Sequence, residues 1–417
     1  MTERRERETG LSPSPAAHEK RTSDMRVAIN GMGIAGPTLA YWLRRSGHDP
    51  VLFEKAPEVR TGGYLIDFWG LGYEIAERMG IISTLRERGY EMKRLQMVDR
   101  NGREEAHMDL TPLYEAQRGR FISVARADLA SALAGACQGI PIHFNVSISA
   151  IAKDGAGSLV TFTDGRQERF DLVVGADGLH SQVRALAFGP EAQFERFLDC
   201  YVAAFRVRGY PHRDELTFVS HTVRGRQAAR VSLRDDETVV MLVCGTERIG
   251  ADHRGHGDPR PLLRQAYGEM GWEVPELLDA MDASEDVYFD RVSQIHLPQW
   301  GAGGVALVGD AAACPSLLAG EGTGLGMLEA YVLAGELHRA DGDCARALAA
   351  YEDRLRTFVS GKQKGAIWFR GFFAPQTDAG LMVRNLAVRA FALPRLGKPF
   401  WARSLHDDFT PPDYQMG

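Results

Sequence analysis

The sequence has little cysteine, no long apolar run and no excess of positive charge. Its five cysteines are scattered, and no two of them form a C-x-x-C pair. This argues against a zinc ribbon or a dithiol redox pair, and a sparse, odd set of cysteines is typical of a reducing cytoplasm. Without a run of about 18 apolar residues, we expect no membrane span. The chain also lacks a G-x-S-x-G segment, which disfavours a serine hydrolase with a nucleophile elbow.

The charge balance argues against a further class of protein. The chain carries 49 basic and 55 acidic side chains and a formal net charge of −6, whereas nucleic-acid-binding proteins are usually basic. We therefore expect no nucleic-acid partner. A small group of metal-type ligands, Asp252, His253, His256 and Asp258, lies in a glycine-rich stretch. Such a stretch does not fix ligand geometry, so we expect no metal site.

Glycine, by contrast, is abundant. It makes up 45 of 417 residues, roughly 11% against an average of about 7%. This excess predicts several tight turns, or several places where the backbone comes close to a ligand. The hydrophobic fraction of 44% and the charged fraction of 25% are typical of a globular protein, and the length suits two to three domains. We expect the polar, charged residues 1–24 to be a disordered extension.

The first glycine motif follows this extension directly. The pattern predicts a buried strand over residues 26–30, a helix over 34–46 and a second strand over 50–53, which together form a βαβ unit of a parallel sheet. The turn 31–36 has the form G-x-G-x-x-G, and Glu54 follows the second strand. In such a turn the backbone amides approach a pyrophosphate, and the acid accepts hydrogen bonds from a ribose. An ordinary strand–helix turn is the alternative.

Two further predicted strands end in glycine and aspartate. Residues 171–178 are Asp-Leu-Val-Val-Gly-Ala-Asp-Gly, and residues 304–310 are Gly-Val-Ala-Leu-Val-Gly-Asp. A glycine-rich turn at residues 320–326 then leads into a helix through about His338. Taken alone, each strand end is also explained by an ordinary turn built from aspartate and glycine.

The middle of the chain has a different pattern. Short β-type runs at residues 201–207, 216–223, 227–233 and 238–243 are separated by turn signals, which predicts an antiparallel meander instead of βα alternation. Because the α/β pattern returns after the meander, we expect a second domain inserted into the first. A charged helix is expected from about Cys344, followed by apolar and arginine-bearing stretches.

The three motifs, in this order and at these distances, resemble the flavin-dependent aromatic hydroxylases. These class A flavin monooxygenases share the p-hydroxybenzoate hydroxylase fold and include tetracycline-inactivating enzymes. The family has G-x-G-x-x-G near the start, a DG motif in mid-chain (here Asp177-Gly178) and a GD motif later (here Gly309-Asp310). The resemblance covers about residues 25–340.

The resemblance implies an α/β fold with an α+β insert. A Rossmann-like FAD-binding domain with a parallel sheet would be interrupted by a substrate domain with a mostly antiparallel sheet, and C-terminal helices would follow. The implied divisions are a discontinuous FAD-binding domain (25–90, 115–190 and 295–340), a substrate-binding domain (91–114 and 191–294) and a C-terminal helical segment (341–417).

The resemblance also implies which residues bind FAD. By position these are Gly31, Gly33, Ile34, Ala35, Gly36, Glu54, Lys55, Asp67, Arg126, Asp177, Gly309, Asp310, Gly320, Gly322 and Thr323. Pro315, Gly322, Thr323 and Gly324 would lie near the flavin ring, and Arg184 would lie with Asp177 near the pyrophosphate and a groove for the nicotinamide cofactor. The sequence departs from the family in two places. Ala311 to Ala313 follow the GD acid where relatives usually have a bulkier polar side chain, and Gly324 stands where many have asparagine.

The implied reaction is an oxygenation. NADPH or NADH would reduce FAD, O2 would add to give a flavin C4a-hydroperoxide, and one oxygen atom would pass to an aromatic or polycyclic small molecule. No catalytic side chain is assigned, because the flavin carries the chemistry. A flavin-dependent dehydrogenase, reductase or halogenase on the same fold and a dinucleotide-binding sensor without turnover are the alternatives; no W-x-W-x-I-P segment supports a halogenase. The oligomeric state, a monomer included, is open.

Overall fold

The computed structural model describes residues 24–59, 64–250, 257–393, 397 and 405–416. The extension predicted at residues 1–24 lies outside the described part except for its last residue. The same holds for Asp252, His253 and His256 of the glycine-rich stretch. Within the described residues, no helix is both long and apolar enough to cross a membrane.

A six-stranded sheet collects strands from distant parts of the chain. In spatial order these are β17 (Gly301–Ala302), β18 (Val305–Leu307), β11 (Leu172–Gly175), β1 (Arg26–Asn30), β2 (Asp49–Glu54) and β7 (Ile142–Phe144). All neighbours are parallel except β17 and β18. β1 and β11 are short, almost wholly buried runs rich in valine and other apolar residues, the composition typical of strands inside a parallel sheet.

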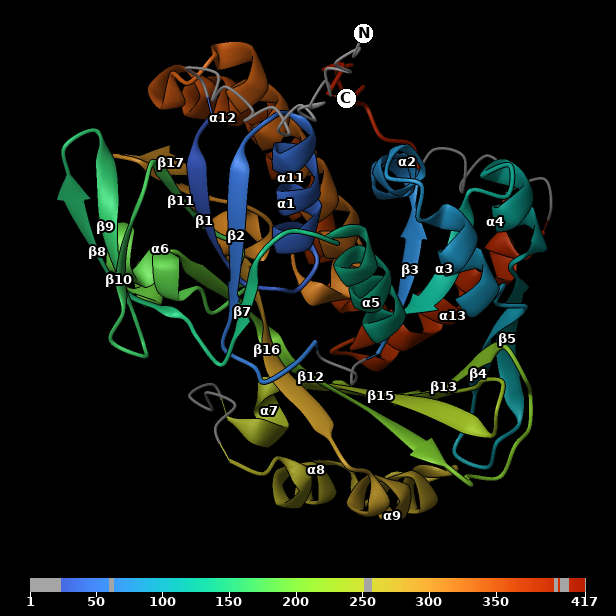
Figure 1. Ribbon diagram of the computed structural model, residues 1–417. Coiled ribbons are helices and arrows are strands. Elements are labelled where there is room, and N and C mark those ends of the chain that lie inside the picture. The colour runs from blue at the N-terminus through green and yellow to red at the C-terminus, as the bar shows by residue number, and fades with distance from the viewer. Residues whose placement is uncertain (1–23, 60–63, 251–256, 394–396, 398–404, 417) are drawn as a thin grey trace, which may run out of the picture.

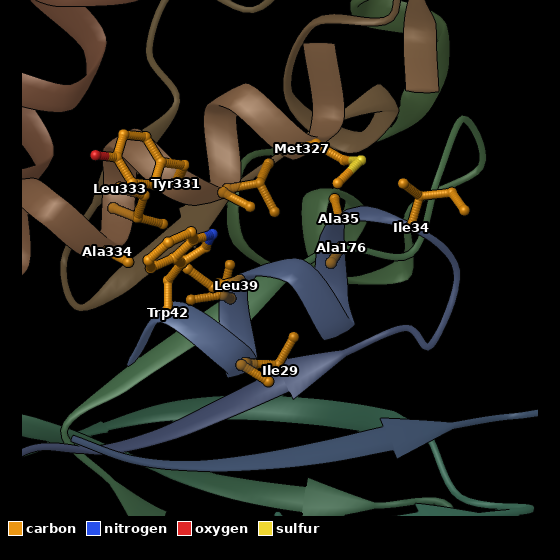
Figure 2. Close-up of a cluster of buried hydrophobic side chains, with 14 of the residues drawn as sticks. Ile29, Ile34, Ala35, Leu39, Trp42, Ala176, Met327, Tyr331, Leu333 and Ala334 are labelled. Carbon is orange, nitrogen blue, oxygen red and sulfur yellow. The ribbon is translucent and has the colours of Figure 1, made fainter. Parts of the chain in front are cut away.

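Two helices pack together against this sheet. α1 (Ala35–Arg45) lies beside α11 (Gly322–Ala340), which is buried along most of its length (Figure 1). Because α11 is apolar nearly all round, it suits the inside of the molecule. Trp42 of α1 meets Tyr331 of α11 edge-on, with ring centroids 4.9 Å apart. Figure 2 shows the side chains of Leu39 and Trp42 gathered with those of α11 above β1.

A seven-stranded sheet contains the predicted meander and confirms it. The meander strands are β12 (Glu195–Arg208), β15 (Glu237–Gly245), β14 (Arg226–Ser232) and β13 (Thr217–Val223), flanked by β16 (Val287–Ile295) on one side and by β4 (Arg94–Val98) and β5 (Glu104–Asp109) on the other. All pairs are antiparallel except β13 with β4. α8 (Arg260–Tyr267) and α9 (Val274–Ala283) cover one face, against apolar side chains such as Phe205 and Leu242 (Figure 1).

The remaining elements connect and flank the two large sheets. Two small antiparallel sheets contain β10 (Gln167–Phe170), β9 (Gly157–Phe162) and β8 (Ile148–Asp154), and β3 (Leu65–Trp69) with β6 (Phe121–Ala125). The other helices are α2 (Gly70–Arg78), α3 (Ile82–Arg88), α4 (Thr111–Ala116), α5 (Arg126–Ala136), α6 (Gln182–Ala187), α7 (Thr246–Ile249), α10 (Asp310–Ala313), α12 (Cys344–Phe373) and α13 (Asp378–Phe391), with short 3-10 turns η1 (Glu191–Gln193) and η2 (Leu317–Ala319).

Several element boundaries differ from the sequence prediction by one or a few residues. α1 begins at Ala35, because Ile34 is its N-cap residue. β12 begins at Glu195, several residues before the predicted strand, and its pairing with β16 shifts register between Phe197 and Tyr201. An irregularity of this kind interrupts the alternation of side chains, which hides the first part of the strand from a pattern with a period of two.

Candidate functional site

The turn between β1 and α1 is packed too tightly for a side chain at two of its three glycines. A Cβ at Gly31 would lie 2.4 Å from the carbonyl oxygen of Ala176, and one at Gly36 would lie 1.9 Å from the carbonyl oxygen of Gly31. Gly31 also has a φ of +115°, which favours glycine. At Gly33, by contrast, the nearest atom to such a Cβ belongs to the Arg126 guanidinium, 3.7 Å away. The turn therefore faces the Arg126 guanidinium at Gly33, and a Cβ there would meet no close contact.

Glu54 fastens the end of β2 to this turn. Its carboxylate accepts hydrogen bonds from the backbone N–H of Met32 at 2.8 Å and from that of Ala56 at 2.9 Å. An acidic side chain therefore lies at the glycine turn, as a ribose contact would require. Lys55, the next residue, is exposed.

The GD motif lies against both α1 and α11. Gly309 has a φ of +64°, and a Cβ there would come within 3.2 Å of the Ala35 Cβ. A Cβ at Gly322, the first residue of α11, would lie 3.4 Å from a carboxylate oxygen of Asp310 and 4.0 Å from the ring of Pro315. Asp310, Pro315 and Gly322 thus surround one small space at the N-terminus of α11.

Arg126, the first residue of α5, brings positive charge to this space. Its backbone N–H donates to the carbonyl oxygen of Tyr64 at 3.1 Å. Burial raises the pKa of the Asp310 carboxyl, and the guanidinium groups of Arg126 and Arg184 oppose that rise. Burial likewise raises the pKa of the Tyr64 phenol, with Arg126 again opposing it. Arg126 therefore lies near the glycine turn, near Tyr64 just before β3, and near Asp310 of the GD motif.

Neither α1 nor α11 has a side-chain cap in the described part of the chain. Their N-cap residues are Ile34 and Glu321, and neither side chain bonds to the amides that follow it. The first amide groups of a helix lack partners within the helix and carry partial positive charge, so they favour an anionic or electron-rich group. The two predicted glycine segments therefore present two helix N-termini suited to such a ligand.

Asp67 lies on β3 and lines a small hollow. The Ser123 hydroxyl donates to its carboxylate at 2.5 Å, while burial raises the pKa of the carboxyl. The Asp67 side chain is exposed within the hollow, but the protein packed around its carboxyl makes a negative charge costly there. The hollow is also lined by Gly320 and Gly324, by the aromatic residues Trp69 and Phe358 and the buried Phe68, and by charged residues of α12 and the C-terminal tail.

Asp177 and Arg184 are held by protein partners. The Asp177 carboxylate accepts hydrogen bonds from the Asn30 side-chain amide at 2.9 Å and from two backbone N–H groups at the start of α6, so it joins β1 to α6. Arg184 is fully buried; it donates to the Ala311 carbonyl oxygen at 3.1 Å and to the Glu191 carboxylate at 2.7 Å. The guanidinium of Arg184 therefore lies inside the protein, where it joins the GD segment to Glu191.

Sequence reasoning missed an ion-pair cluster beside the glycine-rich segment. Lys362 of α12 donates to Glu321 at 3.1 Å and to Asp407 of the C-terminal tail at 2.7 Å. Asp407 in turn accepts a hydrogen bond from the Leu71 backbone N–H at 3.0 Å. α12 and the tail therefore hold the residue that directly precedes Gly322. No local pattern marks this cluster, because its members lie far apart in the chain.

The comparisons with known proteins decide the family. A family model described as "FAD binding domain" matches residues 24–360. The chain belongs to this FAD binding domain family. A flavin-dependent monooxygenase of Legionella longbeachae is 32% identical over 401 residues, which are 94% of this chain and 99% of the relative. Another flavin-dependent monooxygenase, from an unknown prokaryotic organism, is 33% identical over 357 residues, 86% of this chain and 92% of the relative.

A solved structure supports the same assignment. Tetracycline destructase Tet(51) matches with a TM-score of 0.79 and 28% identity, over 94% of this chain and all of that one. The predicted resemblance, the mixed α/β fold and the enzyme class are confirmed: the chain is a class A flavin-dependent monooxygenase that binds FAD. The roles of single residues stay predictions.

The cofactor of this monooxygenase family fits the arrangement of its residues. In the glycine turn beside Glu54, a Cβ at Gly33 would have free space. At the start of α11 beside Asp310, a Cβ at Gly322 would have free space as well. Both spaces adjoin an uncapped helix N-terminus. A pyrophosphate at α1 and an electron-rich ring at α11 are groups that these termini suit.

Removal of the Glu54 carboxylate is expected to weaken FAD binding. A hydrogen bond to a charged group contributes about 1.5–3 kcal/mol, so Glu54→Ala should lower the affinity for FAD roughly 10- to 100-fold. Glu54→Gln, which keeps one acceptor oxygen, should lose less. Titration of the apoprotein with FAD, followed by fluorescence quenching, measures the effect. The control is Glu58→Ala, at an exposed acid on the same segment; equal affinities in both alanine variants would contradict the assignment.

Glu329 of α11 is another residue that the sequence analysis missed. Its side chain is 1% exposed. The carboxyl accepts hydrogen bonds from the Gly309 backbone N–H at 2.6 Å and from the Tyr351 hydroxyl at 3.3 Å. Glu329 therefore holds the GD motif against α11. Burial raises its pKa from 4.5 to about 8. The folded protein therefore keeps a proton that the unfolded chain releases above about pH 4.5.

This raised pKa makes a prediction for the pH dependence of stability. The contribution of Glu329 is fully present below about pH 4.5 and is lost as the pH rises to about 8, because the unfolded state binds fewer protons over that interval. The loss is on the order of 3–5 kcal/mol. In Glu329→Gln, whose amide does not titrate, the free energy of unfolding should fall less between pH 5 and 8. Urea denaturation of the apoprotein at several pH values measures both slopes; parallel slopes would contradict the prediction.

Proposed function

We propose that this monooxygenase uses NAD(P)H and O2 to oxygenate an aromatic or polycyclic small molecule, with FAD at the N-termini of α1 and α11. The observation that carries the proposal is the convergence of Glu54, Arg126, Asp310 and Gly322 on these two uncapped helices. When bound, FAD supplies the redox chemistry that joins the reducing equivalents of NAD(P)H to one atom of O2. The other oxygen atom leaves as water.

The protein's own part in this proposal is to bind, orient and stabilise. The amides at Gly33 and the α1 N-terminus take the pyrophosphate, and Glu54 takes ribose hydroxyl groups. Arg126 and Asp310 hold the chain that links the phosphates to the ring. The first amides of α11 would stabilise negative charge at the ring. The remaining predicted contacts belong to the same proposal: Gly31, Ile34, Ala35, Gly36, Lys55, Asp67, Asp177, Gly309, Pro315, Gly320, Gly322, Thr323 and Gly324.

The division into domains is part of this proposal. The six-stranded sheet draws its strands from residues 25–90, 115–190 and 295–340, and we assign it to FAD. The seven-stranded sheet draws on residues 91–114 and 191–294, with β16 ending at the boundary, and we assign it to the substrate. The sequence has one G-x-G-x-x-G turn, so NAD(P)H would bind transiently in a groove. Scattered, free cysteines favour action in the cytoplasm.

Two observations support an aromatic or polycyclic substrate. The hollow beside Asp67 and Gly324 is lined by two partly exposed aromatic residues, Trp69 and Phe358, and aromatic residues suit a flat apolar ring system. The similar protein Tet(51) is named a tetracycline destructase, and tetracycline is polycyclic. We extend this substrate class to the present chain.

The experiment is a turnover assay with a product measurement. The FAD-loaded protein is mixed with NADPH or NADH in the presence of isotopically labelled O2 and a panel of aromatic and polycyclic compounds, including a tetracycline. We expect substrate-dependent NAD(P)H oxidation and a product that carries one labelled oxygen atom. If NAD(P)H were oxidised at the same rate with every compound, and hydrogen peroxide were the only oxygen product, the protein would be a reductase or oxidase. A protein that takes up no FAD would overturn the site as well as the reaction.

A further inference from the structure

An acidic residue stands directly before the helix N-terminus at which we place the flavin ring. Glu321 is the N-cap residue of α11, and Gly322 is the first residue of that helix. The Glu321 side chain is 18% exposed, so solvent screens its negative charge only in part. An uncompensated charge of this sign would oppose the stabilisation that the α11 amides offer to negative charge at the ring.

Lys362 of α12 supplies a compensating positive charge. Its Nζ lies 3.1 Å from the Glu321 carboxylate and 2.7 Å from the Asp407 carboxylate, and its side chain is 17% exposed. These three side chains, the Glu321 cluster, line the same hollow as Gly320 and Gly324. With two acids and one cation, the Glu321 cluster has a formal charge of −1.

Asp407 has a second compensating partner, which Glu321 lacks among the described residues. The Asp407 carboxylate accepts a hydrogen bond from the Leu71 backbone N–H at 3.0 Å, in the first turn of α2. The partial positive charge at a helix N-terminus favours an acid there. The ion pair with Lys362 is therefore the interaction that compensates Glu321.

The ion pair also determines where the Glu321 carboxylate lies. A side-chain oxygen at an N-cap position can accept hydrogen bonds from the first amides of its helix. Here the carboxylate is bonded to Lys362 instead, and α11 has no side-chain cap. The amides that we assign to the flavin ring therefore stay available to it.

We propose that Lys362 is a positioning residue that acts through Glu321 to raise the reduction potential of the bound flavin. Charge near the ring tunes the electronics of a flavin, and charges that are mostly buried interact more strongly than charges in water. Lys362 neutralises Glu321 and holds its carboxylate away from the α11 amides. The inference rests on the proposed function, which places the ring at Gly322.

The test measures the midpoint reduction potential of the FAD-loaded protein, without substrate, by spectroelectrochemical titration at pH 8.5. Burial raises the pKa of the Glu321 carboxyl, and a high pH keeps it ionised. Lys362→Met changes the formal charge of the Glu321 cluster from −1 to −2, whereas Glu321→Gln changes it to 0. We expect the equilibrium constant for reduction to fall at least about fivefold in the first variant and to rise at least about fivefold in the second, roughly 20 mV in each direction for a two-electron couple.

A double variant and a matched control separate charge from structure. Lys362→Met/Glu321→Gln restores a charge of −1, so its equilibrium constant should return to within about twofold of the wild type. Arg354→Met breaks another ion pair between α12 and α11, that of Arg354 with Glu336. Glu336 lies about four turns farther along α11, roughly 20 Å from Gly322. Because this exceeds the Debye length of about 8 Å, the control should change the constant less than about twofold.

Two results would overturn the proposal. One is a potential that stays at the wild-type value in both single variants. The other is a double variant that keeps the deficit of Lys362→Met, because that deficit would then come from a disturbed fold. If Lys362→Met does not retain FAD, Glu321→Gln and the double variant carry the test, with the former expected above the latter. Since no substrate is present, failure of the proposed oxygenation in the turnover assay leaves this measurement unaffected.

Discussion

Gly36→Ala is expected to destabilise the protein and to abolish FAD binding. The added Cβ would stand 1.9 Å from the carbonyl oxygen of Gly31, and that oxygen belongs to backbone held between two packed strands. Alanine gains about 1 kcal/mol over glycine inside a helix. Overpacking of a core costs about 1–3 kcal/mol or more, and here α1 would have to move away from β1. The clash therefore outweighs the gain, and urea denaturation should show a lower free energy of unfolding.

Gly135→Ala is the matched control for this substitution. Gly135 lies in α5, and a Cβ there would meet nothing within 4 Å. The same change of residue should therefore raise the free energy of unfolding by up to about 1 kcal/mol and leave FAD uptake intact. If Gly36→Ala unfolded at the same urea concentration as Gly135→Ala and kept its flavin, the close packing at the turn would be wrong.

The contrast between these two glycines shows how far the sequence could predict the fold. A G-x-G-x-x-G turn between a strand and a helix is a local pattern, and the structure places β1, α1 and β2 where that pattern predicts them. The meander was equally accessible, because alternation and turn residues are local too. The parallel pairing of β13 with β4 could not be predicted in this way. Those strands lie far apart in the chain, and neither strand's composition identifies its partner.

The candidate site divides in the same way. Glu54 could be predicted because a fixed spacing links it to the glycine turn. Lys362 and Glu329 could not, since a charged residue on a helix does not show in its own sequence which distant residue it contacts. Both hold predicted motifs in place: Lys362 pairs with the residue before Gly322, and Glu329 accepts a hydrogen bond from the N–H of Gly309. The motifs contain the residues that are predicted to contact the ligand, whereas residues far away in the sequence hold these motifs in position.

Gly322→Val is expected to remove FAD while the apoprotein stays folded. Gly322 has no positive φ, unlike Gly31, and no neighbour closer than 3.4 Å to an added Cβ, unlike both Gly31 and Gly36. The protein itself therefore tolerates a side chain there. The branched methyl groups would instead enter the space beside Asp310, at the amides that should stabilise the flavin ring. We expect FAD affinity to fall at least about 100-fold, roughly 2.7 kcal/mol, and Gly322→Ala to give an intermediate loss.

Gly361→Val separates this effect from the general cost of valine in a helix. Gly361 lies in α12, where a Cβ would meet nothing within 4 Å, so the variant should lose some helix stability but keep its affinity for FAD. Fluorescence titration with FAD and circular dichroism of the apoprotein, measured on all three variants, distinguish loss of the cofactor from loss of the fold. A Gly322→Val protein that retained FAD and turned over at the wild-type rate would mean that the ring lies elsewhere, because no side chain can share that space with it.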